Sequence, residues 1–193
     1  VLYETAKENF SKLVKNLIDG IAAFDETVRG QEVKNCVFRI YRDIRFSKNK
    51  APYKTHLGAA FSDGGKTSFE PGYYIHIEPG NNFLAGGVWH PEPPQLQAIR
   101  QEIAYNEEEF RAILSDKNFK KHFKALDEED MLKTVPKGYE KDHPALDLLK
   151  HKSFTVTYSF DDKELFSPDF EKNILKVFKL MLPLNKFLKR ATD

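Results

Sequence analysis

The segment 39–54 holds the densest group of side chains able to bind an anion. The chain has 30 basic and 29 acidic residues, and this segment contains six of the basic residues and one of the acidic ones. The rest of the chain therefore has 24 basic and 28 acidic residues. The seven are Arg39, Arg42, Arg45, Lys48, Lys50, Lys54 and the acid Asp43. Guanidinium groups bind carboxylate or phosphate through paired hydrogen bonds. We therefore expect Arg39, Arg42, Arg45 and Lys54 to hold a small anionic ligand. The alternative interpretation is a solvated strand and loop whose arginines pair with glutamates.

Four stretches of the chain alternate polar and apolar residues, as strands of a sheet do. Because the apolar sides must share a core, we expect the polar sides to form one face. The residues of that face are Arg39, Asp43 and Arg45; His56, Gly58, Ala60 and Ser62; Tyr74, His76 and Glu78; and Ser153, Thr155, Thr157 and Ser159. Gly58, Ala60 and the pair Gly86-Gly87 would leave room for a ligand. The alternative is the ordinary solvated face of an antiparallel sheet.

His76 and Glu78 lie on the same side of one expected strand, which suits a general acid–base pair. His56 and Tyr74 lie on the same face and complete the expected ligand-binding set. Histidines 56, 76 and 90 together with Glu78 are also metal-ligand types, but their spacing matches no zinc motif. The sequence therefore predicts no metal site, and it identifies no cofactor.

The elements that would position these residues follow from hydrophobic periodicity. Spacings of three and four predict a helix over about 2–24, and further helices over 93–103, 106–114, 145–150 and 168–181. Alternation predicts strands over 34–46, 56–62, 73–78, 83–89 and 154–160. The first four strands are joined by short turns, which favours an antiparallel meander. We expect one α+β domain over 1–193, with a mostly antiparallel sheet of about five strands and helices packed on one face.

Composition excludes several classes of protein. The 193 residues carry a net charge of +1, which is not the overall charge of a nucleic-acid coat. The single cysteine, Cys36, cannot form an internal disulfide and is expected to be buried. There is neither an apolar run of 18 residues nor a visible signal peptide, so we expect a cytoplasmic protein without membrane contact. Val1 is not a start methionine, so an N-terminal segment is expected to be missing.

Three blocks of the sequence resemble domain-of-unknown-function family 2461, a family of bacterial and fungal proteins. They are Arg39–Lys48 with Lys50 and Pro52-Tyr53-Lys54; Tyr73–Gly80 with Gly86–Trp89; and Ile99-Arg100 with Pro136–Tyr139 and Asp142–Pro144. The resemblance covers nearly the whole chain and implies a cytoplasmic domain, but it supplies no activity, substrate or catalytic residue. Family members usually carry an additional N-terminal segment with an asparagine pair and a Trp-Phe, so the resemblance implies that such a segment precedes Val1.

Three functional hypotheses follow from the residues. The first is binding of a phosphate- or carboxylate-bearing ligand on the polar sheet face, with His76 and Glu78 available for proton transfer. The second is a nucleic-acid-associated module whose Lys48–Lys54 loop contacts the backbone, although the near-neutral total charge counts against it. The third is a protein-interaction domain without catalysis. The sequence leaves the ligand, the reaction and the oligomeric state unknown.

Overall fold

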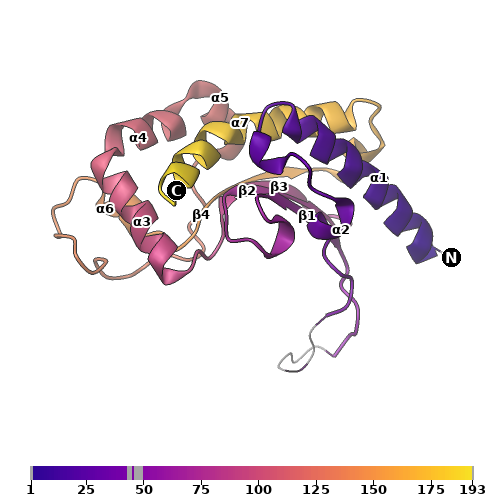
Figure 1. Ribbon diagram of the computed structural model, residues 1–193, viewed down its shortest axis with the longest axis horizontal. Coiled ribbons are helices and arrows are strands. Elements are labelled where there is room, and N and C mark those ends of the chain that lie inside the picture. The colour runs from indigo at the N-terminus through magenta and orange to yellow at the C-terminus, as the bar shows by residue number, and fades with distance from the viewer. Residues whose placement is uncertain (1, 43–44, 46–49, 193) are drawn as a thin grey trace. The chain divides into compact units, whose positions relative to one another are not determined.

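A four-stranded antiparallel sheet is the centre of the computed structural model, which describes residues 2–42, 45 and 50–192 (Figure 1). The strands lie in chain order: β1 (Leu57–Ser62), β2 (Gly72–Ile77), β3 (Asn82–Val88) and β4 (Phe154–Phe160). The helices within the described residues are α1 (Leu2–Ala22), α2 (Val33–Cys36), α3 (Pro93–Tyr105), α4 (Glu107–Ser115), α5 (Lys117–Phe123), α6 (Leu146–Leu149) and α7 (Phe170–Arg190). The expected α+β class is confirmed.

The expected strand over 34–46 is wrong, and for this reason the sheet has four strands rather than about five. Residues 33–36 form the one-turn helix α2, and the following residues run antiparallel to 52–59 through single bridges. Arg42 donates its backbone N–H to the carbonyl of Pro52, and Pro52 has no N–H to return. Such pairing is too sparse for a regular ladder. We call residues 37–42, 45 and 50–56 the arm; Asp43, Ile44, Phe46 and residues 47–49 lie outside the described residues.

By its internal packing the chain divides into two compact units. Unit 1 consists of Val1–Ser68, Tyr73–Leu84 and Ser159–Lys179, and unit 2 of Phe69–Gly72, Ala85–Tyr158 and Leu180–Asp193. Each unit therefore takes parts of the sheet and of α7 from segments that are distant in the sequence.

Unit 1 buries one face of β1 and β2 under helices. Phe61 and Tyr73 project from this face, and their rings lie 6.1 and 5.2 Å from the ring of Phe178 in α7. Helix α1 packs against α7 so closely that a methyl group on Gly20 would meet Leu175 at 2.5 Å. The apolar stripe expected from residue 2 becomes buried only from Phe10 onward. The opposite face of these strands is consequently free to carry polar groups.

Unit 2 has its own core between β4, the end of β3 and α3, α4, α6 and the second part of α7. The core contains Ile99, Ile103, Phe110, Leu149, Phe154, Phe187 and Leu188. Helix α7 continues through Pro183 to Arg190, beyond the end expected at 181, because the apolar residues after the proline are buried. At Gly87 the backbone has a φ of 113°, and a Cβ atom there would lie 1.9 Å from the carbonyl oxygen of Phe154. Only glycine fits this approach.

No helix among the described residues is both long enough and apolar enough to cross a membrane. Cys36 is fully buried, as expected, and burial raises the pKa of its thiol to about 11.

Candidate functional site

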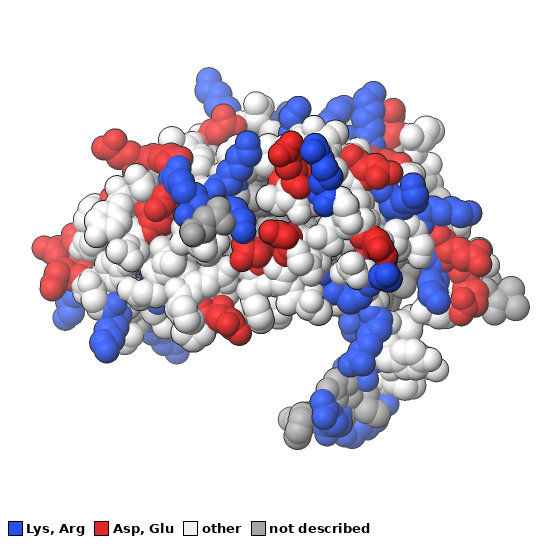
Figure 2. Space-filling view, in the orientation of Figure 1, with Lys and Arg blue, Asp and Glu red and all other residues white. Residues whose placement is uncertain are grey.

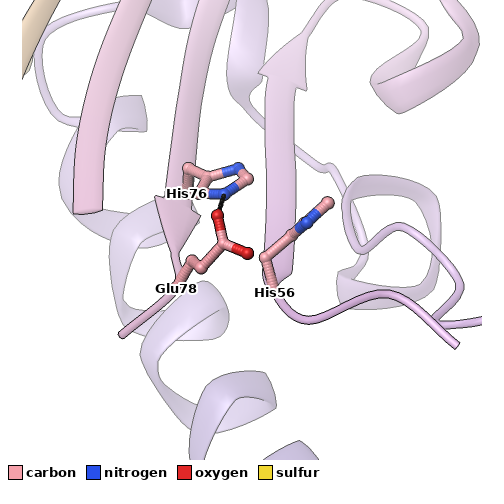
Figure 3. A group of neighbouring side chains, drawn as sticks. All are labelled: His56, His76 and Glu78. Carbon is pink, nitrogen blue, oxygen red and sulfur yellow. Dashed lines mark hydrogen bonds and ion pairs between the residues drawn. The ribbon is translucent and has the colours of Figure 1, made fainter. Parts of the chain in front are cut away.

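Two imidazoles and one carboxylate converge on the polar face of unit 1 (Figure 3). His56 immediately precedes β1, His76 lies in β2, and Glu78 follows the end of β2. One ligand-type atom from each of the three lies within 4.8 Å of the others. Alternation along β2 puts His76 and Glu78 on one side, and antiparallel pairing brings the start of β1 beside the end of β2. The sequence predicted this juxtaposition correctly.

The His76 ring is enclosed on both faces and both edges. It stacks on Phe83 with centroids 4.5 Å apart and on His56 with centroids 4.2 Å apart. At its edges, Nδ1 lies 2.9 Å from the hydroxyl of Tyr74, and Nε2 lies 3.4 Å from Oε2 of Glu78. Only 7% of His76 is exposed. Its orientation is therefore set by four neighbours rather than by solvent.

Hydrogen bonds determine where the protons of this group lie. Bonds from Thr55, Asn81 and His76 lower the pKa of Glu78 to about 2, so it is a carboxylate at neutral pH and can only accept. His76 then carries its proton on Nε2, and Nδ1 accepts the hydrogen bond of the Tyr74 hydroxyl. Burial, and to a lesser degree Glu78, raises the pKa of Tyr74 to about 12, so the phenol keeps its proton. The result is a continuous chain from hydroxyl through imidazole to carboxylate.

His56 is the more accessible imidazole of the two, since it is half-buried. Burial lowers its pKa, and His76 and Lys54 lower it further, while Glu78 acts in the opposite direction. A neutral imidazole is the form that accepts a proton or binds a metal. His56 can therefore act as an acceptor toward a group that approaches from solvent.

One cationic side chain of the arm, Lys54, lies near this cluster, and Arg39 lies near Lys54. The ammonium of Lys54 lies 5.5 Å from the centroid of the Phe38 ring, and its pKa is lowered by burial and then by Arg39. Within the described part of the chain, neither Arg39 nor Lys54 forms an ion pair with a carboxylate. Figure 2 shows Lys and Arg side chains gathered on the arm. Positive charge of the arm thus adjoins the imidazole–carboxylate group.

The other two arginines of the expected set lie farther along the arm. Arg42 is half-buried, and Arg45 is exposed. Pairing of Phe38 with Gly58 lies next to β1, whereas Arg42 pairs with Pro52 farther along the arm, which extends away from the sheet in Figure 1. Of the expected ligand-binding residues, the structure groups His56 and Tyr74 with His76 and Glu78, with Lys54 beside His56. Arg39 is linked to this group only through Lys54.

The room expected around the glycines of the sheet is absent. A methyl group on Gly58 would meet the Tyr74 hydroxyl at 2.6 Å, so the tyrosine already fills that space. Met181 fills the space at Gly86, and the backbone of Phe154 fills that at Gly87. These three glycines therefore open no space for a ligand over the sheet.

The polar residues of β4 do not contribute to this cluster either. In unit 2 the hydroxyls of Thr155 and Thr157 both donate to Oδ2 of Asp127, at 2.8 and 2.9 Å. Ser153 is buried and accepts the backbone N–H of His90. These three residues make their hydrogen bonds within their own unit.

Three residues of the site were not expected from the sequence. Phe83 stacks on His76, and Thr55 and Asn81 donate to the carboxylate of Glu78. The turn Pro79-Gly80-Asn81 offered a signal for Asn81, because a side-chain amide in a tight turn often bonds a nearby polar group. Phe83 and Thr55 carried no such signal, since their contacts depend on strand pairing.

Comparison with known proteins identifies a family without an assigned activity. No curated protein and no solved structure matches the chain significantly. One family model, described as "Conserved hypothetical protein (DUF2461)", matches residues 1–187. The match spans the arm and both units, as the three resembling blocks of the sequence implied. The chain belongs to the DUF2461 family.

Proposed function

We propose that this chain is a cytoplasmic protein that binds a small phosphate- or carboxylate-bearing ligand where the arm meets the polar face of unit 1. Arg39 and Lys54 hold the anion, and His56 contacts it from the edge of β1. Arg42 and Arg45 add positive charge farther along the arm, and Tyr74 holds the His76 ring through its hydroxyl group.

One observation carries this proposal. Arg39 and Lys54 are close enough for their like charges to interact, yet among the described residues neither has a carboxylate partner. Holding two cations together without a counter-ion costs free energy, most of all for a lysine that is partly shielded from water. An anion between them removes that cost and gains charge-assisted hydrogen bonds.

Calorimetric titration with inorganic phosphate tests the anion site. We expect the double variant Arg39→Gln, Lys54→Gln to lose about 100-fold in affinity, because each charge-assisted hydrogen bond contributes about 1.5–3 kcal/mol and each 1.4 kcal/mol is tenfold. The matched control is Lys12→Gln, Lys15→Gln, which removes the same charge from the exposed face of α1. Equal binding by both double variants would refute the proposal.

The proposal includes proton transfer through His76 and Glu78. The contacts with Tyr74 and Glu78 orient the His76 ring, and Glu78 is the acceptor for the proton on Nε2. Because His76 is enclosed, it relays and orients, and His56 is the imidazole that meets the ligand. NMR of the imidazole nitrogens is expected to show His76 protonated on Nε2 in the metal-free protein. A proton on Nδ1 instead would remove this path.

An exposed aromatic pair on the arm favours a second candidate, binding of single-stranded nucleic acid. Tyr41 and Tyr53 are 60% and 53% exposed, and their rings lie 5.3 Å apart beside the basic residues of the arm. Aromatic rings next to Lys and Arg are the usual platform for stacking bases. Lys48, part of the loop expected to contact the backbone, lies outside the described residues.

Fluorescence titration with mixed-sequence single-stranded and duplex DNA separates the two candidates. The nucleic-acid function requires affinity that falls steeply with log salt, and a loss of about 1–3 kcal/mol for Tyr41→Ala or Tyr53→Ala. Absent or salt-independent binding to both probes leaves the small anion as the function.

A further inference from the structure

The cluster of His56, His76 and Glu78 has the composition of a metal site in which one coordination position stays open. Two histidines and one glutamate bind zinc in catalytic-type centres, and water or substrate takes the fourth position. The sequence alone predicted no metal site because the spacing from residue 56 to residue 76 fits no zinc motif. The fold supplies the convergence that the spacing does not reveal.

The distance between His76 and Glu78, at the long end for a hydrogen bond, also suits coordination of a shared ion. Their facing atoms, Nε2 and Oε2, lie 3.4 Å apart, which is long for a hydrogen bond between an imidazole and a carboxylate. Two ligands bound tetrahedrally to one Zn²⁺ at about 2.0–2.1 Å are separated by about 3.4 Å. The pair is therefore already at the spacing that a shared ion requires.

The outer contacts of these ligands are those that metal sites use to fix ligand orientation. The second nitrogen of His76, Nδ1, is held by the Tyr74 hydroxyl at 2.9 Å, so Nε2 is the nitrogen left to bind the ion. Asn81 donates to Oε2 of Glu78 at 2.9 Å, and Thr55 donates to Oε1. Such contacts hold a ligand ready and raise its affinity for metal.

The cluster is reachable from solvent on the side of His56 and Glu78. His76 forms the floor with 9% of its side chain exposed, whereas 24% of the Glu78 side chain is exposed and His56 is half-buried. His56 needs only a small inward rotation to join the other two, since all three ligand atoms lie within 4.8 Å. An ion can thus enter without opening the core.

We propose that His56, His76 and Glu78 bind one Zn²⁺ ion, with the fourth position open toward the arm. Binding of the ion changes the tautomer of His76: Nε2 coordinates the ion, and Nδ1 takes a proton that it donates to the hydroxyl oxygen of Tyr74. Only one part of this inference rests on the proposed function, namely that the anion held by Arg39 and Lys54 occupies the fourth position.

Cobalt titration of protein freed of metal on a chelating resin, in phosphate-free buffer, tests the site. Tetrahedral Co²⁺ gives intense visible absorption bands, which Zn²⁺ should abolish by displacement. We expect one equivalent of Co²⁺ to produce these bands. Substitution of a residue that only contacts a metal ligand weakens metal binding about 10- to 100-fold. His56→Ala and Glu78→Gln remove a ligand itself, so each should weaken Co²⁺ binding by more than that. His56 is accessible and its substitution leaves the core intact, so circular dichroism should show a folded variant.

The control is His90→Asn, which removes an exposed histidine of unit 2 at a residue whose φ of 48° asparagine tolerates. It should bind Co²⁺ like the unaltered protein. Imidazole NMR adds an independent readout, since Zn²⁺ should move the His76 proton from Nε2 to Nδ1. Absence of tetrahedral bands, or bands that survive both His56→Ala and Glu78→Gln, would overturn the proposal.

Failure of this inference is distinguishable from failure of the anion site. Phosphate binding by the metal-free protein that depends on Arg39 and Lys54, without Co²⁺ binding, removes the metal and keeps the anion. In the opposite case, Co²⁺ binding depends on His56 and Glu78, but the double variant Arg39→Gln, Lys54→Gln binds phosphate like the unaltered protein. That result refutes the anion site and supports the metal site.

Discussion

Two arginines of unit 2 and two basic residues of the arm in unit 1 differ in their partners. In unit 2, Arg111 lies 2.7 Å from the carboxylates of both Glu107 and Asp147, and Arg190 is held equally closely by two glutamates of α3 and α4. In unit 1, Arg39 and its neighbouring lysine have no carboxylate partner among the described residues. A guanidinium that is already paired serves the fold, whereas a cation that lacks such a partner is available to a ligand.

Glycines show the same difference between the units. Gly87 in unit 2 faces the backbone carbonyl of Phe154, which cannot move without breaking the pairing of β3 with β4. Gly58 in unit 1 faces the end of the Tyr74 side chain, which can rotate. The contact at Gly87 is therefore fixed by backbone, and the contact at Gly58 beside the site is adjustable. Four substitutions can break or sharpen this contrast.

Gly87→Ala should have the largest effect. The new Cβ would lie 1.9 Å from a carbonyl oxygen at a φ of 113°, so both a backbone clash and backbone strain arise. We expect a loss of at least about 4 kcal/mol in the free energy of unfolding, or no folded protein at all. Urea denaturation measures it. A variant as stable as the unaltered protein would show that the approach of the two strands is not rigid.

Arg100→Met should follow in size. Arg100 is buried and donates to the carbonyls of Leu149 and His151 at 2.8 and 3.1 Å. Its removal leaves two buried carbonyl oxygens without their donor, which we expect to cost about 3 kcal/mol in urea denaturation. Arg39→Met, in contrast, should change stability by no more than about 0.5 kcal/mol. Similar losses for both variants would contradict the division between structural and ligand-binding arginines.

Gly58→Ala tests the adjustable side of the contrast. The added methyl group must displace the Tyr74 hydroxyl, which lies 2.6 Å from its position. We expect a modest destabilisation of about 1–2 kcal/mol, because a side chain gives way more easily than backbone. The displaced hydroxyl should also release Nδ1 of His76, with a change in its NMR signal. An unchanged His76 signal would indicate that Tyr74 does not hold the ring.

Arg111→Met should have the smallest effect, and one that depends on pH. Hydrogen bonds from Arg111 lower the pKa of Asp147 below its ordinary 3.8. The charged pair therefore contributes stability above about pH 4, and this contribution is lost as pH falls through the lower pKa of the folded protein. Because the Asp147 side chain is 62% exposed, we expect less than about 1 kcal/mol.

Denaturation of the Arg111→Met variant at a series of pH values provides the measurement. Its difference from the unaltered protein should be constant from pH 7 to about pH 5 and should shrink below about pH 4. Arg29→Met serves as the control, since Arg29 makes one exposed contact of 3.3 Å with Glu26. A difference that grows as the pH falls would show that the sign of the Arg111 contribution is wrong.

Local patterns were sufficient for most elements of this fold. Alternation located β4 to the residue and β1 and β2 within one residue at each end. The helix periodicity located α1 and α3 within about two residues. The pattern failed at 34–46, where alternating residues form a short helix and an arm instead. Alternation describes which side chains could share a face, but a regular strand also needs a partner that can return its hydrogen bonds, and Pro52 cannot.

The residue set of the candidate site was also visible in the sequence. Side-chain chemistry picked out His56, His76 and Glu78 together with the basic segment, because imidazole, carboxylate and guanidinium are the groups that bind ions and move protons. Strand alternation then placed His76 and Glu78 on the same side. Both inferences rest on chemistry and on spacing within a few residues, which a linear sequence preserves.

Which of these groups are already satisfied was decided only by tertiary structure. The enclosure of His76 by Phe83 and Tyr74, the saturation of Thr155 by Asp127, and the filling of the space at Gly58 all depend on contacts across strands or between distant segments. Hydrogen bonds and van der Waals contacts act over only a few ångströms, and sequence distance says nothing about such approaches. The sequence therefore names the chemical groups, and the packed structure determines which of them remain available.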